Sequence, residues 1–400
     1  MKIDKVTIDN LEKLYLTIGV NNIPGIIVYA PNTYHYTLLN LNNLEKYFFK
    51  LHEENNLQVA EISEDVFGIS PVINYHKNPG PARKIADRIM KLADKLKIHI
   101  ISIGTGADIY SLMQLSGGYY DVPKEKKDKV MQIFKNLIDI AEYMGILNIN
   151  GHRVATIFPE RFKSIKISQL SDELGFDVKL GGIDPDTEIT GAEAKNLELA
   201  ITLQNYSPHV SSTVELMYQA GMEPCTIGQM NRFLRIMQAN SSKNVVAHMD
   251  TGHVIPYGKD KKQEDYNLLS YANITFPRWT VHFNALYKNE HRMPTYENVK
   301  KDLDSIKEKP DPVLSPHPEM YCDVYEWLGR VVRNCRVIQV SPEPKPNNLK
   351  KLSKEVGECW DILKEKFSDT HIPYPDIEGI LIPKSFYEDN RRSNERKQPQ

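Results

Sequence analysis

The sequence contains few cysteines, no long apolar run and no excess of charge of either sign. Its cysteines, Cys225, Cys322, Cys335 and Cys359, are far apart and form no CxxC pair, which argues against a zinc knuckle and a disulfide framework. We expect reduced thiols and a cytoplasmic protein. The first residues, MKIDKVTIDN, lack the apolar stretch of a secretory signal, and no later run approaches the roughly 20 apolar residues of a membrane span. No membrane partner is expected.

The charges nearly cancel. Lysine and arginine total 50 against 52 acidic residues, which leaves a net charge of -2 and no positive surplus to follow a phosphate backbone. We therefore expect no nucleic-acid partner. A chain of 400 residues with 41% hydrophobic residues is long enough to bury one large core.

Short apolar, β-branched runs alternate with longer segments of helical period, which is typical of parallel βα units. The eight candidate strands are 24–29, 57–62, 97–102, 146–149, 212–218, 244–249, 278–283 and 312–315. Helices are expected near 42–54, 85–96, 130–141, 188–203, 227–239, 262–270, 296–308 and 321–333. Together these elements predict an α/β fold, a (β/α)8 TIM barrel over residues 1–340.

Two segments exceed a minimal barrel. Residues 150–186, rich in Gly, Asp and Pro, predict a loop insertion over the barrel mouth. Residues 341–400 open with the proline-rich SPEPKPNN and continue as a helix over 349–367. We interpret them as a C-terminal helical extension with a flexible tail.

Polar residues close four successive predicted strands, and in a TIM barrel the active site lies at these carboxyl ends. The residues are Glu215 in TVELMY, Asp250 in VVAHMDTGH, His282 in WTVHFN and Glu319 in VLSPHPEM. They are 35, 32 and 37 residues apart, each close to one βα unit. Carboxylates with one imidazole suit a hard divalent cation with positions open to substrate. The pattern predicts one metal site with these four ligands.

Taken singly, each of these residues also fits a structural role. Glu215 could be a solvent-facing strand residue, and DTGH a turn with an N-cap aspartate. His282 could be a buried histidine bonded to a backbone carbonyl, and Glu319 an acid at a helix N-terminus. Their occurrence together, at the ends of consecutive strands, favours a single shared site.

The motifs resemble those of the xylose-isomerase-like barrels, which include the tagatose and psicose 3-epimerases and L-rhamnose isomerase. In that family a glutamate ends strand five, Asp-x-x-His follows strand six, a histidine ends strand seven and an acid follows strand eight. The matching positions are Glu215, Asp250 with His253, His282 and Glu319. The likeness covers residues 80–335 in pattern. It departs at strand eight, where HPEM leaves His317 and Glu319 as alternative fourth ligands.

The resemblance implies a sugar isomerase or epimerase that works through an enediolate on a monosaccharide or sugar phosphate. Mn²⁺ is the expected metal, with Mg²⁺, Co²⁺ or Zn²⁺ as alternatives. Glu215 and Glu319 would remove and return the proton on opposite faces of the substrate, while His253 would bond a substrate oxygen. Further candidate substrate contacts are Asn284, Lys288, Arg292 and His317. By the same resemblance we expect a homodimer or homotetramer.

Three other functions stay open. A lyase of the same superfamily, such as an inosose dehydratase or a C-glycoside deglycosidase, would use the same enediolate for β-elimination. An endonuclease IV-like DNA repair enzyme would need more His and Glu ligands and a basic groove, which the net charge disfavours. A non-catalytic carbohydrate-binding barrel would need no acid/base pair.

Overall fold

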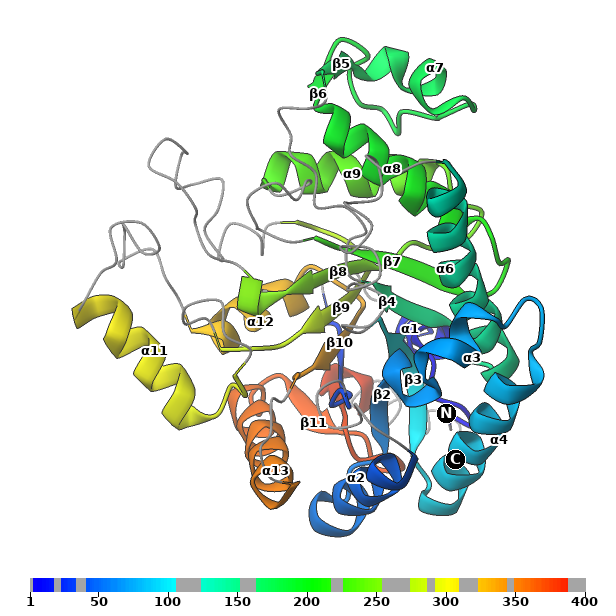
Figure 1. Ribbon diagram of the computed structural model, residues 1–400. Coiled ribbons are helices and arrows are strands. Elements are labelled where there is room, and N and C mark those ends of the chain that lie inside the picture. The colour runs from blue at the N-terminus through cyan, green and yellow to red at the C-terminus, as the bar shows by residue number, and fades with distance from the viewer. Residues whose placement is uncertain are drawn as a thin grey trace, which may run out of the picture.

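Eight parallel strands form the centre of the molecule (Figure 1). The structure is a computed structural model that describes residues 3–17, 23–33, 41–105, 124–151, 163–216, 226–253, 274–285, 292–308, 323–343 and 349–387. The strands are β1 (Ile26–Tyr29), β2 (Val59–Ser63), β3 (His99–Gly104), β4 (Asn148–Gly151), β7 (Ser211–Leu216), β8 (Ala247–Asp250), β9 (Arg278–His282) and β10 (Val337–Ser341). Their order is β1-β10-β9-β8-β7-β4-β3-β2. The predicted TIM barrel is confirmed.

The two ends of this parallel order, β1 and β2, meet through residues just beyond β1. Just beyond β1, Asn32 forms a parallel bridge with Glu61, and the Thr33 amide donates to the Glu61 carbonyl over 3.2 Å. The contact joins the segment just after the carboxyl end of β1 to the middle of β2.

Helices surround the strands and cover their outer faces (Figure 1). They are α2 (Leu41–Asn55), α4 (Gly80–Leu96), α6 (Lys124–Met144), α8 (Gly191–Gln204), α9 (Ile227–Ala239), α11 (Tyr296–Glu308), α12 (Val324–Val332) and α13 (Leu349–Lys366). In α9, the Thr226 hydroxyl accepts from the Gln229 amide and the Gln229 side chain accepts from the Thr226 amide, which is a capping box. The α9 side chains Met230, Phe233 and Leu234 are buried against the core, as the helical period predicts.

The eighth strand is not where the sequence pattern placed it. We expected it at 312–315, which lies outside the described residues, but β10 fills the position between β1 and β9 in register with both. Two helices, α11 and α12, precede it, so this unit is longer than a regular βα unit. The strand is the β-branched run VIQV, in which Gln339 interrupts the apolar pattern.

The insertion after β4 also differs from expectation in its described part. Residues 163–190 contain β5 (Ile165–Lys166), η3 (Ile167–Gln169), α7 (Leu170–Leu174) and β6 (Glu188–Ile189), and Figure 1 shows them outside the helix ring beside α8 and α9. Asn240, at the end of α9, exchanges hydrogen bonds of 2.7 and 2.8 Å with the backbone of Lys179. Because α9 ends on the side from which β8 starts, Lys179 lies toward the amino end of the barrel.

The C-terminal segment docks on the barrel rather than trailing from it. Helix α13 packs on α2, and Asn55 of α2 bonds the Ser353 carbonyl at 3.0 Å. Beyond α13, β11 (His371–Pro373) and β12 (Ile380–Pro383) form a hairpin whose β12 pairs antiparallel with β1. The expected tail, 388–400, lies outside the described residues, as does the helix expected at 262–270.

The amino end of the barrel is filled by apolar side chains and closed by helix α1 (Ile8–Leu16). Leu11 and Leu14 of α1 pack there with Ile26, Val28 and residues of the C-terminal hairpin. Polar side chains instead occupy the interior toward the opposite end, so the barrel has one apolar end and one polar end. Within the described residues, no helix combines the length and apolarity that crossing a membrane requires.

Candidate metal centre

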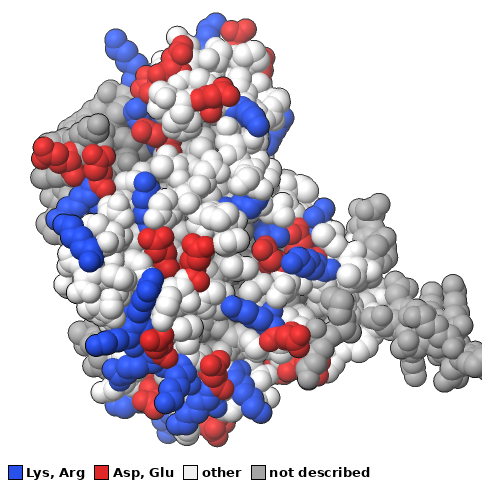
Figure 2. Space-filling model, turned by 90° about the vertical axis from the view of Figure 1, so that its right-hand side faces the viewer, with Lys and Arg blue, Asp and Glu red and all other residues white. Residues whose placement is uncertain are grey.

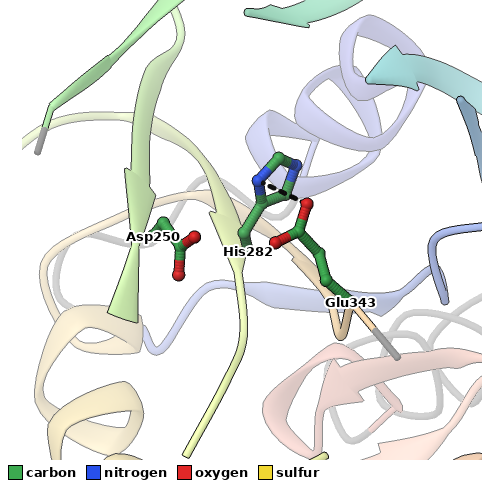
Figure 3. Close-up of side chains that lie close together, drawn as sticks. All are labelled: Asp250, His282 and Glu343. Carbon is green, nitrogen blue, oxygen red and sulfur yellow. Dashed lines mark ion pairs between the residues drawn. The ribbon is translucent and has the colours of Figure 1, made fainter. Parts of the chain in front are cut away.

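Three buried side chains meet at the carboxyl ends of β8, β9 and β10 (Figure 3). Asp250 ends β8, His282 ends β9, and Glu343 lies two residues beyond β10. Asp250 and His282 are paired in register, so they reach the same height. Each residue offers one ligand atom, and these atoms all lie within 4.8 Å of one another. Groups at this spacing can share one ion.

The imidazole of His282 lies between two carboxylates. Its Nδ1 is 3.1 Å from Oε1 of Glu343, and its Nε2 is 3.2 Å from Oε1 of Glu61 on β2. The ring of His248 contacts it edge-on, with centroids 4.4 Å apart. His282 is only 1% exposed, so the orientation of its ring is fixed by these neighbours.

Short polar bonds order the turn after β8 and join it to the segment after β9. The Gly252 amide donates to Oδ1 of Asp250 over 2.6 Å, and the Thr251 hydroxyl donates to the Asn284 carbonyl over 2.7 Å. A Cβ on Gly252 would lie 3.1 Å from that Oδ1, so a glycine allows this turn to close. The Asn284 side-chain amide lies between the ligand carboxylates, 3.0 Å from Asp250 and 3.4 Å from Glu343.

The donor set fits a divalent cation. Two carboxylates and one imidazole, all buried, face a common centre. Such hard oxygen donors with a single nitrogen suit Mn²⁺ or Mg²⁺, and they also accommodate Zn²⁺ or Co²⁺. Burying two acids together is costly unless positive charge compensates them. A cation at this position would provide that charge.

Comparison with solved structures identifies the fold. A putative xylose isomerase from Rhodospirillum rubrum aligns with a TM-score of 0.52 at 11% identity, over 85% of this chain and 99% of that one. This chain shares the TIM-barrel fold of that protein. A D-psicose 3-epimerase from Clostridium cellulolyticum aligns with a TM-score of 0.48 at 11% identity, over 84% of this chain and 98% of that one. No family model and no curated protein matches the sequence.

Within this barrel, the four expected ligand positions have different outcomes. Asp250 and His282 are brought together. Glu215 lies on β7, the neighbouring strand, in register with His248, although its side chain is outside the described part. Glu319 is also outside it. Since the eighth strand is β10, the acid that follows this strand is Glu343, so the reason for choosing Glu319 no longer holds.

The expected substrate contacts are mostly outside the described part of the chain. Lys288 and His317 belong to segments that the structure does not describe, and His253 closes η4 (Thr251–His253) with its side chain outside the described part. Asn284 is fully buried and bonds the two ligand carboxylates. Arg292 accepts a backbone bond from Ala285, which places it next to the segment after β9.

Sequence reasoning missed two acids of the site, Glu343 and Glu61. The signal for Glu343 was a β-branched run, VIQV, followed by Ser-Pro-Glu. The signal for Glu61 was a charged residue inside an otherwise apolar strand, VAEIS. An acid in such a strand is rarely buried unless it has partners.

Proposed function

We propose that this protein is a divalent-metal-dependent enzyme that isomerises or epimerises a monosaccharide or sugar phosphate through an enediolate. The observation that carries the proposal is the buried group of Asp250, His282 and Glu343 at the carboxyl ends of successive strands. In TIM barrels this end holds the active site.

Asp250, His282 and Glu343 would hold the ion, and Glu215 would complete the set from the adjacent strand β7. When bound, a divalent cation polarises a sugar carbonyl and acidifies the neighbouring C–H. Mn²⁺ is the metal to test first, followed by Mg²⁺, Co²⁺ and Zn²⁺. The buried carboxylates would be held in place by Asn284 and by the turn through Gly252.

Proton transfer is assigned to the two glutamates. Glu215 comes from β7 and Glu343 from the segment after β10, and β8 and β9 lie between those strands. The two carboxylates would thus approach a substrate from opposite sides of the Asp250 and His282 pair. One would remove the proton and the other would return it. His253 would donate a hydrogen bond to a substrate oxygen.

The net charge of the chain favours a small substrate over a nucleic acid. On the face that carries α4 and α6, acidic side chains lie among the basic ones, including the lower region where blue is densest (Figure 2). A DNA-binding groove requires basic residues that follow a phosphate backbone. The near-zero net charge agrees with this interpretation.

Deuterium exchange tests the proposal. The full chain loaded with Mn²⁺ is incubated with a panel of ketoses and ketose phosphates in deuterium oxide, and carbon-bound deuterium is measured by mass spectrometry. We expect exchange with at least one sugar and a loss of about 10²–10⁴-fold in Glu215→Gln, the range for removal of an acid/base group. No exchange on any sugar by the loaded wild type would contradict the proposal.

Product analysis in the same samples separates the possible reactions. An epimer or aldose product supports the proposed reaction. An unsaturated or dehydrated product would instead identify a lyase. A suitable control is Glu12→Gln, since Glu12 lies in α1 at the amino end of the barrel and bonds Arg278 rather than the site.

A further inference from the structure

Glu61 is a fully buried carboxylate inside the barrel. It extends from β2, and its side chain has no exposed surface. Its Oε1 accepts from Asn32 over 2.5 Å. Its Oε2 accepts from Ser102 over 2.5 Å, from Gln339 over 2.8 Å and also from Asn150. Four side chains therefore donate to one carboxylate.

These donors keep Glu61 an acceptor. The asparagine and glutamine amide nitrogens can only donate. Ser102 itself accepts from Gln339 over 2.7 Å, so its own hydroxyl proton points to Glu61. No lysine or arginine is bonded to Glu61 in the described part of the chain. Both oxygens of Glu61 accept from protein side chains, so its carboxylate is engaged by the barrel interior rather than by a substrate.

The remaining partner of Glu61 is His282. Nε2 of that imidazole lies 3.2 Å from Oε1 of Glu61. Since this oxygen is an acceptor, Nε2 carries the proton and donates it. The other nitrogen, Nδ1, then presents its lone pair toward the region shared with Glu343 and Asp250. A ligand histidine bonded to a carboxylate through its second nitrogen is held in one tautomer and one orientation.

We propose that Glu61 is a positioning residue that holds His282 ready to bind the metal through Nδ1. The inference rests on the proposed function, because it assumes an ion at the site. It assigns a role to a residue on β2, which lies three strands beyond β7 in sheet order. The ring of polar side chains around Glu61 is then part of the metal site and not only of the core.

The packing around Glu61 is consistent with a fixed support. Gly104 ends β3, and a Cβ there would lie 3.1 Å from Nδ2 of Asn32 and 3.3 Å from Oε1 of Glu61. A larger residue would press on both members of this bond. On the other side, the edge-on contact with His248 restricts rotation of the His282 ring. Gly104 and His248 together restrict the relative orientation of Glu61 and His282.

Calorimetric titration of Mn²⁺ into the metal-depleted full chain tests the inference. Glu61→Gln keeps the size of the side chain, but only one of its two terminal atoms can accept a hydrogen bond. The bond from Nε2–H of His282 is therefore weakened. We expect Mn²⁺ affinity to fall by about 10–100-fold, as for other partners of ligand histidines. Glu12→Gln, a buried glutamate at the other end of the barrel, should bind Mn²⁺ like the wild type.

The outcomes are distinguishable. If the wild type binds no Mn²⁺, the proposed function fails. If the wild type binds Mn²⁺ and a folded Glu61→Gln binds it equally well, the positioning role is overturned. Thermal melts establish that each variant is folded. Should Glu61→Gln not fold, Glu61→Asp decides, because it keeps the charge but shortens the reach by one methylene. It should bind Mn²⁺ more weakly than the wild type, and equal affinity would refute the inference.

Discussion

Nδ1 of His282 lies 3.1 Å from Oε1 of Glu343, which follows the adjacent strand β10. Both side chains are almost completely buried, so solvent screens their interaction little. Asp250 lies in the same group, with its ligand atom within 4.8 Å of the other two. Three segments distant in the sequence thus converge on one point, and the metal assignment depends on this convergence.

Metal removal should destabilise the protein. An ion bound by the native state alone adds about 2.7 kcal/mol to the free energy of unfolding at 100 times its Kd. We expect a chelator to lower the Tm and Mn²⁺ to restore it, measured by differential scanning calorimetry. Asp250→Asn should show a Tm that does not respond to Mn²⁺. A wild-type Tm that is the same with and without chelator would count against a bound metal.

Glu343 and Glu319 can be told apart as ligands. Since Glu343 follows the eighth strand, Glu343→Gln should weaken Mn²⁺ binding by at least about 10-fold, comparable to the lower limit for partners of the ligands. Glu319→Gln is the matched change at the position first expected from sequence and should leave the affinity unchanged. Calorimetric titration of both variants gives the comparison, and the reverse ranking would restore Glu319.

The ligands on β8 and β9 could be predicted because each follows its strand after one regular βα unit. Asp250 and His282 are 32 residues apart, which matches that unit. The step from His282 to Glu343 is 61 residues because two helices, α11 and α12, intervene. A fixed spacing of one βα unit therefore predicted Glu319 as the ligand after the eighth strand. The role of Glu61 could not be predicted either, because its partners come from β3, β4, β9 and β10, and only the closed barrel brings them together.

The closure of the amino end depends on a buried ion pair. Arg278, at the start of β9, donates from Nε to Glu12 over 2.7 Å and also bonds Asp9. Arg278→Met should lower the free energy of unfolding by about 3 kcal/mol, since breaking a buried pair leaves an acid buried with fewer partners. Urea unfolding measures this. Arg330→Met removes an exposed pair with Glu326 and should cost less than about 0.5 kcal/mol. Equal losses of unfolding free energy in Arg278→Met and Arg330→Met would refute the role assigned to the Arg278 ion pair.

His371 should make stability depend on pH. Burial holds the pKa of His371 below its ordinary value of 6.5, although its bond to the Gly25 carbonyl acts in the opposite direction. The unfolded chain therefore takes up this proton first as the pH falls. The free energy of unfolding should decrease from pH 6.5 down to the folded-state pKa, by at most about 1.4 kcal/mol per pH unit for one group.

The comparison that isolates this effect is His371→Gln against the wild type, by urea unfolding between pH 7 and pH 5. As the pH falls, the free energy of unfolding should decrease less in His371→Gln than in the wild type. The pKa of His99 is also lowered by burial, so His99 contributes a pH-dependent loss of stability in both proteins. Parallel pH curves for the two proteins would show that His371 does not contribute.

Metal analysis of the purified chain tests the central claim most directly. Wild type and His282→Gln are loaded with Mn²⁺, passed through gel filtration to remove free ions, and measured by plasma mass spectrometry. The account predicts one Mn²⁺ per wild-type chain and none in the folded variant. Equal metal content in the two proteins, or none in the wild type, would contradict it.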